Sequence, residues 1–205
     1  MKPEYWDRAR RALSRRDVVM QKIIRARPGI NLMRRGEPFL TLARAIVGQQ
    51  ISVKAAQSVW DRVVACAGAV TPEGILLKKP KELRACGLSD RKTEYIVDLA
   101  RRFAEGLVHP YRWDEMTDEE VIADLVQVRG IGRWTAEMFL IFNLLRPDVF
   151  PLDDLGLQKA IRVSYFRKRP VSVSRMRKLG ESWRPWRSVA TWYLWRSLDP
   201  VPVEY

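Results

Sequence analysis

The stretch that decides the fold is residues 125–159, LVQVRGIGRWTAEMFLIFNLLRPDVFPLDDLGLQK. It holds a glycine-flanked turn at residues 130–132, an apolar helix expected over about residues 133–145, a proline-bounded loop, and the pair Asp153 and Asp154. At 1.5 Å per residue, that helix would be roughly 20 Å long. A loop after such a helix can bring a carboxylate back towards the turn. The order of these features predicts anion binding and acid–base chemistry on one short piece of chain.

The turn at residues 130–132 suits a phosphate group. Gly130 and Gly132 are both expected to permit positive φ, because glycine has no Cβ. The next helix starts there, so its free N–H groups and the positive end of its dipole coincide with the turn. Such a cradle positions DNA without reading its sequence, whereas the alternative is an ordinary glycine turn between packed helices. The apolar residues on either side favour DNA binding, and the candidate contacts are Gly130, Ile131, Gly132, Arg133 and Thr135.

Composition is consistent with a nucleic-acid partner. The chain has 205 residues, of which 47% are hydrophobic, enough to bury a core as one domain or two small lobes. Lys and Arg number 37 against 24 Asp and Glu, giving a formal charge of +13. Such an excess favours a polyanion, because neutralised phosphates release counterions, although anionic membranes also attract basic proteins.

The scarcity of metal-binding residues excludes several kinds of site. Cys66 and Cys86 cannot build a structural zinc site or an iron–sulfur cluster, and we expect both to be buried thiols in a reducing compartment. His109 is the single histidine, which excludes a multi-histidine metal site. The start of the chain lacks an apolar run, and no segment has transmembrane length. We expect a cytoplasmic, nucleoid-associated protein.

Apolar residues recur with helical spacing almost throughout, so the sequence predicts an all-α fold. Thr71 before Pro72, Ser89, and Thr117 with Glu120 three residues later are the expected helix starts. Residues 83–89, LRACGLS, partly repeat the pattern around residue 130. They predict either a second helix-hairpin-helix or a tight turn with a glycine C-cap.

Several ordered motifs resemble the helix-hairpin-helix DNA glycosylase superfamily, of the 3-methyladenine-DNA glycosylase II (alkylbase DNA glycosylase) type. Besides residues 125–159, they are AIVGQQIS at 45–52, GLSDRKTEYI at 87–96, and WRPWRS at 183–188 with Trp195 beyond. The resemblance implies one glycosylase unit, residues 1–205, with two helical lobes and an active-site cleft between them. The central lobe would span about residues 37–142, and the second about 1–36 plus 143–205. The extra N-terminal subdomain of the larger bacterial prototype is expected to be missing.

By this resemblance, Asp154 is the catalytic carboxylate. Asp153 and Asp154 both precede a helical run at residues 155–163, so either can be an N-cap. A single carboxylate can suffice, because an N3- or N7-alkylated purine is already cationic and leaves as a neutral base. One anion beside C1′ can stabilise the developing oxocarbenium charge and can orient or deprotonate water.

The resemblance also assigns aromatic and tip residues. Bifunctional relatives carry a Schiff-base lysine at the position that Trp134 holds here, which predicts a monofunctional enzyme without lyase activity. Trp134 and Trp195 are expected to line the base pocket, where an indole face attracts a cationic base. Met138 stands where the bacterial prototype has tyrosine, which predicts a looser pocket. Three other tryptophans are expected in the core: Trp6, Trp60 and Trp113.

A wedge side chain must fill the gap that an extruded base leaves. Gln50 and Ile51 are the candidates by resemblance, and the alternative for this segment is an interhelical turn with a glycine C-cap at Gly48. Family members also bind a monovalent cation, Na⁺ or K⁺, through hairpin carbonyls, here those of Val126, Val128 and Ile131. No other cofactor is expected.

The main hypothesis is hydrolytic release of 3-methyladenine and 7-methylguanine by a monomer acting on damaged double-stranded DNA in base excision repair. A glycosylase for deaminated or oxidised bases and a non-catalytic DNA-binding protein are the alternatives. The presence of Asp154, Trp134 and Trp195 together argues against the non-catalytic reading. We expect Asp154 and Trp195 to lie together, and not Asp154 to serve solely as a helix cap.

Overall fold

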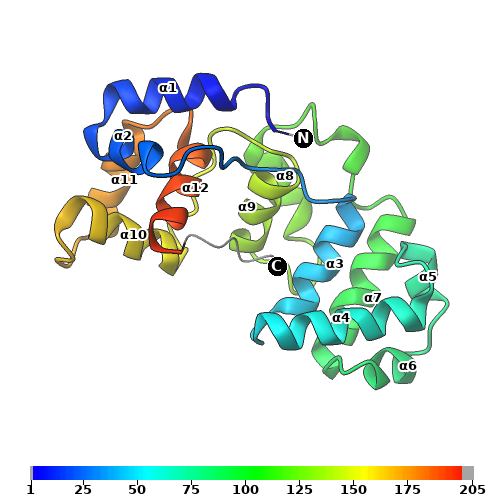
Figure 1. The fold of residues 1–205 in the computed structure, drawn as a ribbon. Coiled ribbons are helices and arrows are strands. Elements are labelled where there is room, and N and C mark those ends of the chain that lie inside the picture. Colours follow the sequence, from blue (N-terminus) through cyan, green and yellow to red (C-terminus); the bar gives the residue numbers. More distant parts are fainter. Residues whose placement is uncertain (1, 200–205) are drawn as a thin grey trace. The chain divides into compact units, whose positions relative to one another are not determined.

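The computed structural model describes residues 2–199, and this part is helical without strands, as expected for an all-α protein (Figure 1). Residues 200–205, where we expected the second lobe to end, lie outside the described part. The α-helices are α1 (Trp6–Arg16), α2 (Val18–Arg25), α3 (Pro38–Gly48), α4 (Val53–Ala67), α5 (Pro72–Leu76), α6 (Pro80–Ala85), α7 (Asp90–Ala104), α8 (Asp118–Leu125), α9 (Arg133–Phe142), α10 (Leu155–Phe166), α11 (Val173–Glu181) and α12 (Arg187–Leu198), with a 3-10 turn at Pro110–Arg112.

The described chain forms two compact units. One comprises residues 2–34 and 140–199, and the other comprises residues 35–139. In the first unit the largest fully buried side chains include Trp6, Trp183 and Tyr193. In the second, Phe103 contacts both Phe39 and Trp113 edge to face. The expected core tryptophans Trp6, Trp60 and Trp113 are all buried.

Local capping signals set many of the helix ends. Thr71 accepts a hydrogen bond from Gly74 N–H, and Ser89 accepts one from Lys92 N–H. Thr117 and Glu120 form the expected capping box at the start of α8. A side-chain cap contributes about 1 kcal/mol, because it satisfies an N–H group that has no partner within the helix. These three expected helix starts are confirmed.

The segment at residues 83–89 forms a glycine-capped turn between α6 and α7. Cys86 is the C-cap, and Gly87 follows with φ of 95° while its N–H donates to Arg84 O at 2.8 Å. A Cβ at Gly87 would lie 2.8 Å from Nη2 of Arg62, so glycine is also required by space. The turn therefore matches the glycine C-cap expectation, whereas a second DNA-binding hairpin here stays a prediction.

The two cysteines differ in exposure. Cys86 is buried, and burial raises the pKa of its thiol to about 11, with the neighbouring Cys66 adding to the effect. Cys66 is half-buried, so the expectation that both thiols are buried is wrong for Cys66, which lies near the end of α4. His109 Nδ1 lies 2.8 Å from an oxygen of the buried Asp124. The described residues contain no group of His, Cys, Asp and Glu side chains that could hold a metal ion.

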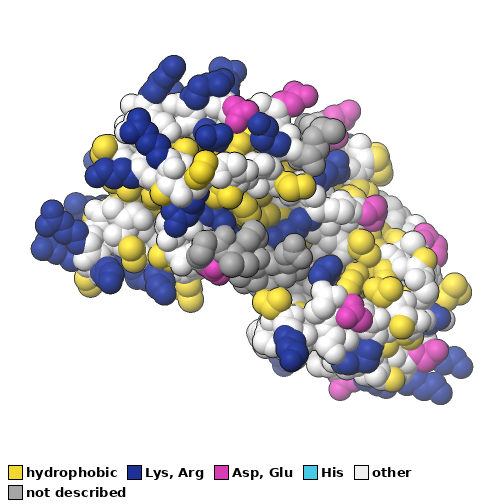
Figure 2. Space-filling model, in the orientation of Figure 1, with side chains coloured by type: hydrophobic (Ala, Val, Ile, Leu, Met, Phe, Trp, Pro, Cys, Tyr) yellow, Lys and Arg dark blue, Asp and Glu magenta, His cyan; other side chains and the backbone are white. Residues whose placement is uncertain are grey.

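Basic side chains gather over α1 (Figure 2), a helix that carries Arg8, Arg10, Arg11, Arg15 and Arg16. Its opposite face is apolar, because Trp6, Ala9 and Leu13 are buried. The exposed face of α1 therefore carries a local cluster of positive charge. None of the described helices combines the length and the apolar character needed to cross a bilayer.

Candidate active site

The loop after α9 begins earlier than expected. We predicted a helix to residue 145, but α9 ends at Phe142. Leu145 adopts a left-handed conformation with φ of 55°, and Arg146 N–H donates to Leu140 O at 2.9 Å. This hydrogen bond turns the chain back on itself. Residues 143–145 contain no glycine or proline to mark the end of the helix, so the apolar spacing extended the predicted helix past its actual end.

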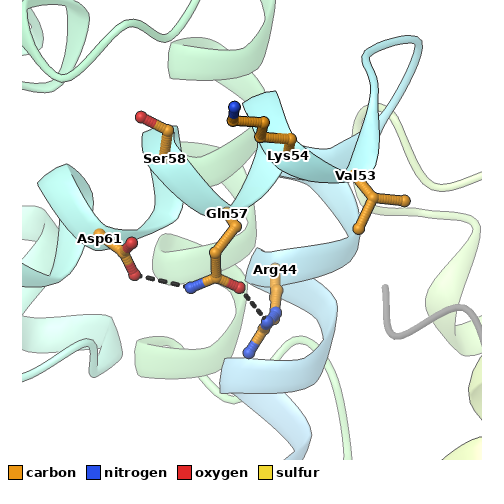
Figure 3. Close-up of a pocket in the computed structure, with 6 residues that line it drawn as sticks. All are labelled: Arg44, Val53, Lys54, Gln57, Ser58 and Asp61. Atoms are coloured by element: carbon orange, nitrogen blue, oxygen red, sulfur yellow. Dashed lines mark hydrogen bonds between the residues drawn. The ribbon is translucent and has the colours of Figure 1, made fainter.

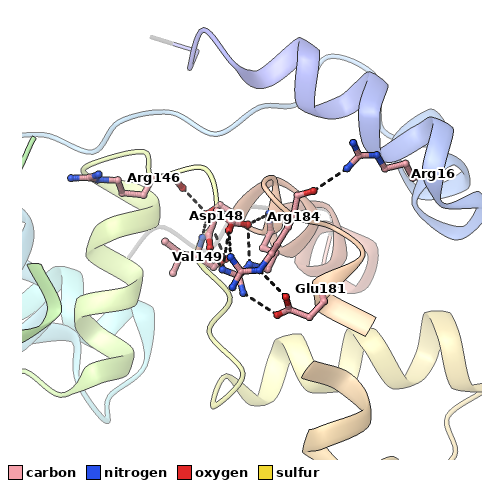
Figure 4. Close-up of polar contacts among 8 residues, drawn as sticks. Arg16, Arg146, Asp148, Val149, Glu181 and Arg184 are labelled. Atoms are coloured by element: carbon pink, nitrogen blue, oxygen red, sulfur yellow. Dashed lines mark hydrogen bonds and ion pairs between the residues drawn. The ribbon is translucent and has the colours of Figure 1, made fainter. Parts of the chain in front are cut away.

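A polar network attaches this loop to the start of α12 (Figure 4). Arg187 donates from Nε to Asp148 Oδ1 and from Nη2 to Asp148 Oδ2, each at 2.9 Å. Ser188 Oγ donates to Arg146 O at 2.6 Å and accepts from Val149 N–H at 2.9 Å. The bidentate pair and the serine thus fix the loop that leads to Asp154 against the helix that carries Trp195.

We predict that Asp148→Asn lowers the free energy of unfolding by about 2 kcal/mol. The change leaves the Arg187 guanidinium with only its longer ion pair to Glu181, at 3.6 Å, and the Asp148 and Arg187 side chains are only 19% and 15% exposed. Thermal or urea denaturation measures the effect. Glu181→Gln is the matched control, because Glu181 is 52% exposed and its ion pairs with Arg184 at 2.8 Å and with Arg187 at 3.6 Å should together contribute under about 0.5 kcal/mol. Equal stabilities of Asp148→Asn and wild type would contradict a stabilising role for the Asp148–Arg187 ion pair.

Asp154 is the N-cap of α10 and also contacts Trp195. Its Oδ1 accepts from Leu157 N–H at 2.6 Å and from Trp195 Nε1–H at 2.8 Å. The residue is half-buried, whereas Asp153 is exposed. Of the two aspartates that could cap α10, Asp154 is therefore the cap. Its second hydrogen bond shows that capping is not its only contact, as the catalytic interpretation requires.

The indole of Trp195 is held between Asp154 and an aromatic pair. It stacks on Phe142, with ring centroids 5.9 Å apart and planes at 15°, and Phe142 meets Trp192 edge to face at 6.0 Å. A Cβ at the exposed Gly156 would lie 3.1 Å from Asp154 Oδ1 and 3.7 Å from the Trp195 ring. Glycine at this position therefore leaves the space beside the Asp154 carboxylate and the Trp195 ring open. Phe142 could not be singled out from the sequence, because no local pattern distinguishes it from Phe139, the buried phenylalanine of the same helix.

The hairpin at residues 130–132 requires glycine at one position only. Gly130 has φ of 82°, and a Cβ there would lie 2.2 Å from Cδ2 of Tyr95. Gly132 is not in the left-handed region, and a Cβ on it would meet no atom within 4 Å. Of the two glycines that permit positive φ, only Gly130 adopts it. Its carbonyl accepts from Ala136 N–H at 3.0 Å, which makes Gly132 the residue from which α9 starts.

The remaining DNA-contact candidates differ in accessibility. Ile131 is buried, and Thr135 is only 9% exposed. Arg133 donates from Nη1 to Glu119 at 2.9 Å and from Nε to Glu137 at 3.2 Å, and the Glu119 carboxylate raises the pKa of the guanidinium. A phosphate would have to compete with these carboxylates for the Arg133 side chain. The backbone around Gly130 and Gly132 is thus the better candidate for a phosphate contact.

Two base-pocket candidates lie one turn apart on α9. Trp134 is 41% exposed, and Met138 is half-buried. Residues four apart share one face of a helix, so both side chains belong to the same surface of the second unit. This spacing places the indole ring of Trp134 beside the flexible thioether of Met138.

The wedge candidates lie in the turn between α3 and α4. Gln50 is exposed with φ of 58°, and Ile51 is 39% exposed. Gly48 is the last residue of α3 and Gln49 is its C-cap, so the alternative of a glycine C-cap at Gly48 is wrong. Beside this turn, an open pocket of about 590 Å³ lies between α3 and α4 (Figure 3). Gln57 crosses it, accepting from Arg44 at 2.5 Å and donating to Asp61 at 2.6 Å.

Comparison with known proteins places this arrangement in a family. Residues 43–185 match the model described as HhH-GPD superfamily base excision DNA repair protein. DNA-3-methyladenine glycosylase 1 of Schizosaccharomyces pombe is 37% identical over 80% of this chain and 74% of its own length. A DNA-3-methyladenine glycosidase structure from Bacillus halodurans matches with a TM-score of 0.86 and 31% identity, over 93% of this chain and 89% of that one. A 3-methyladenine DNA glycosylase of S. pombe in complex with abasic DNA matches with a TM-score of 0.78 and 33% identity, over 97% and 99%. The chain therefore belongs to the HhH-GPD superfamily of base excision DNA repair proteins.

Proposed function

We propose that this protein is a monofunctional DNA glycosylase that hydrolyses the N-glycosidic bond of alkylated purines, 3-methyladenine first and 7-methylguanine next, in base excision repair. The observation that carries the proposal is the Asp154 carboxylate, which Leu157 N–H and Trp195 Nε1–H hold through the same oxygen. The printed names of the relatives from S. pombe and B. halodurans support the substrate class.

A fixed carboxylate can perform this reaction without a partner acid. As the bond from C1′ to an alkylated purine breaks, positive charge develops on the sugar while the base leaves neutral. An anion at Asp154 stabilises that charge electrostatically and accepts a proton from the attacking water. The two hydrogen bonds to Asp154 restrict its rotation, so little reorganisation is needed when the charge appears.

We propose that the enzyme lacks lyase activity, because Trp134 stands where a lyase needs a lysine. An indole cannot form the Schiff base by which a lysine at this position would open the sugar. The product we propose is therefore an intact strand with an abasic site. We also propose base-binding roles for Trp134 and Met138 on α9 and for Trp195 on α12, because indole faces and a polarisable thioether suit a cationic base.

DNA binding is proposed to use the hairpin backbone at residues 130–132, where glycine at position 132 leaves the start of α9 uncovered. The relative solved with abasic DNA supports this partner. The carbonyls of Val126, Val128 and Ile131 are our candidates for holding Na⁺ or K⁺, since backbone oxygens suit hard cations. Of these, Val128 O already accepts from Ile131 N–H at 3.1 Å. We further propose a cytoplasmic monomer that acts on chromosomal DNA.

A panel of duplexes that each carry one lesion tests the substrate class. We expect release from 3-methyladenine and 7-methylguanine duplexes at least tenfold faster than from hypoxanthine, uracil or 8-oxoguanine duplexes. Strand breakage should appear only after treatment with alkali. Preferential release of a deaminated or oxidised base would replace the proposal with that activity, and breakage without alkali would overturn the monofunctional assignment.

We predict that Trp195→Phe lowers the single-turnover rate of base release about tenfold, since a hydrogen bond to a charged group contributes roughly 1.5–3 kcal/mol. Phenylalanine keeps an aromatic ring against Phe142 but removes the N–H that holds Asp154. Trp192→Phe is the matched control, because the buried Trp192 indole N–H has no hydrogen-bond partner among the described residues. Quench-flow measurement of both variants should separate them, and equal rates would show that the N–H is irrelevant.

A further inference from the structure

One side chain connects the turn between α3 and α4 with the hairpin. Gln49 Nε2 donates to Gly130 O at 2.8 Å, across a sequence separation of 81 residues. Gln49 is the C-cap of α3 and is half-buried, whereas the next residue, Gln50, is exposed. The hydrogen bond therefore joins the base of the wedge turn, residues 49–52, to the proposed phosphate-binding turn.

A second contact holds the same turn from α7. Lys92 Nζ donates to Val47 O at 2.8 Å, and burial lowers the pKa of this amine. Val47 lies in the last turn of α3, where carbonyls lack helical partners and a cation is favourable. Tyr95, one turn along α7, occupies the space that a Cβ on Gly130 would need. Helix α7 thus supports both the wedge turn and the hairpin.

The tip of the wedge turn has little support of its own. Gln50 and Ile51 are exposed, and the backbone of Gln50 adopts the left-handed conformation, which residues other than glycine rarely take. Near the tip, Gln49 N–H donates to Ile46 O at 3.3 Å, Ala55 N–H donates to Ser52 Oγ at 3.3 Å, and Ala56 N–H donates to Ser52 O at 2.8 Å. None of these bonds involves Gln50 or Ile51, so the position of the tip depends on contacts at its base, which are those of Gln49, Lys92 and Ser52.

We propose that Gln49 and Lys92 are positioning residues that couple the wedge turn to the hairpin. The coupling makes a phosphate bound at the hairpin fix how far Gln50 or Ile51 enters the DNA stack. Gln49 and Lys92 each donate to a backbone carbonyl of the protein, so we assign them to base extrusion and not to bond cleavage. This inference rests on the proposed function for its wedge, but the coupling itself does not require glycosidic cleavage.

The test uses the full chain and a duplex that the enzyme cannot cleave. A tetrahydrofuran abasic analogue is placed opposite 2-aminopurine, whose fluorescence reports insertion of a side chain beside it. Gln49→Leu keeps a similar volume and removes the donor, and Lys92→Met removes the amine while keeping the alkyl chain. Gln57→Leu is the matched control, because Gln57 is an exposed glutamine on α4 away from the hairpin bond.

We expect Gln49→Leu to lower the insertion equilibrium about tenfold, the loss of one hydrogen bond, with affinity for undamaged duplex changed less than twofold. Amides of residues 49–52 should exchange hydrogen faster in Gln49→Leu and in Lys92→Met than in Gln57→Leu. Lys92→Met keeps the proposal testable if Gln49→Leu does not fold. Wild-type fluorescence and wild-type exchange in both variants would overturn the coupling, as would equal losses of insertion and of affinity for undamaged duplex. A wild-type protein that inserts its wedge side chain but releases no base would contradict the proposed function and leave the coupling intact.

Discussion

Replacing Asp154 with Asn should lower the single-turnover rate of 3-methyladenine release about a thousandfold. Asparagine is as good an N-cap as aspartate, and its carbonyl can accept from both Leu157 N–H and Trp195 Nε1–H. The fold should therefore persist, while the negative charge beside C1′ and the base for water are lost. Unfolding temperature and DNA affinity, measured on the same preparation, should stay close to wild type.

The neighbouring aspartate supplies the control for this variant. Asp153 is exposed and carries the same charge one residue away. Asp153→Asn should keep the rate of base release within about twofold, because a solvated charge is screened over a short distance. Comparable losses in Asp153→Asn and Asp154→Asn would mean that local charge, not the position held by Trp195, governs the reaction.

Replacing Gly130 with Ala should destabilise the protein by about 3 kcal/mol and weaken DNA binding at least tenfold. Two independent causes add at this position. Alanine is strained at φ of 82°, and its Cβ would lie 2.2 Å from the Tyr95 ring, which must move or displace the hairpin. Urea unfolding gives the stability, and fluorescence anisotropy with a labelled duplex gives the affinity.

Gly132→Ala is the matched control for Gly130→Ala. Its φ is ordinary and its Cβ would meet open space, so the stability should change by less than about 0.5 kcal/mol. In a Tyr95→Ala background the steric part of the Gly130→Ala cost should disappear, reducing that cost by about 2 kcal/mol. An unchanged cost in that background would show that backbone strain alone makes glycine necessary at this position.

Features set by neighbouring residues could be predicted from the sequence. The caps at Thr71, Ser89 and Thr117 need only a side chain and an N–H group three residues later, so short patterns identify them. The all-α class follows from apolar spacing that is repeated along the whole chain. The position of Asp154 within an ordered set of motifs identified it as the catalytic candidate. The capping pattern alone allowed either Asp153 or Asp154 to be the N-cap.

Features set by contacts between distant segments could not be predicted. The bond from Gln49 to Gly130 spans 81 residues, and no local pattern marks it. The end of α9 at Phe142 depends on the turn at Leu145 and on the anchoring of the loop by Arg187, neither of which glycine or proline signals. Both glycines of the hairpin looked alike in sequence, and the positive φ of Gly130 and the position of the Tyr95 ring separate them.

The most direct measurement of the central claim is chromatography of the free bases released when purified protein is incubated with methylated duplex DNA. We expect wild type to release 3-methyladenine and to leave strands that break only after treatment with alkali, whereas Asp154→Asn releases almost none. If wild type releases no methylated base, or if Asp154→Asn releases it as fast as wild type, the assignment of Asp154 as the catalytic carboxylate of an alkylbase glycosylase is contradicted.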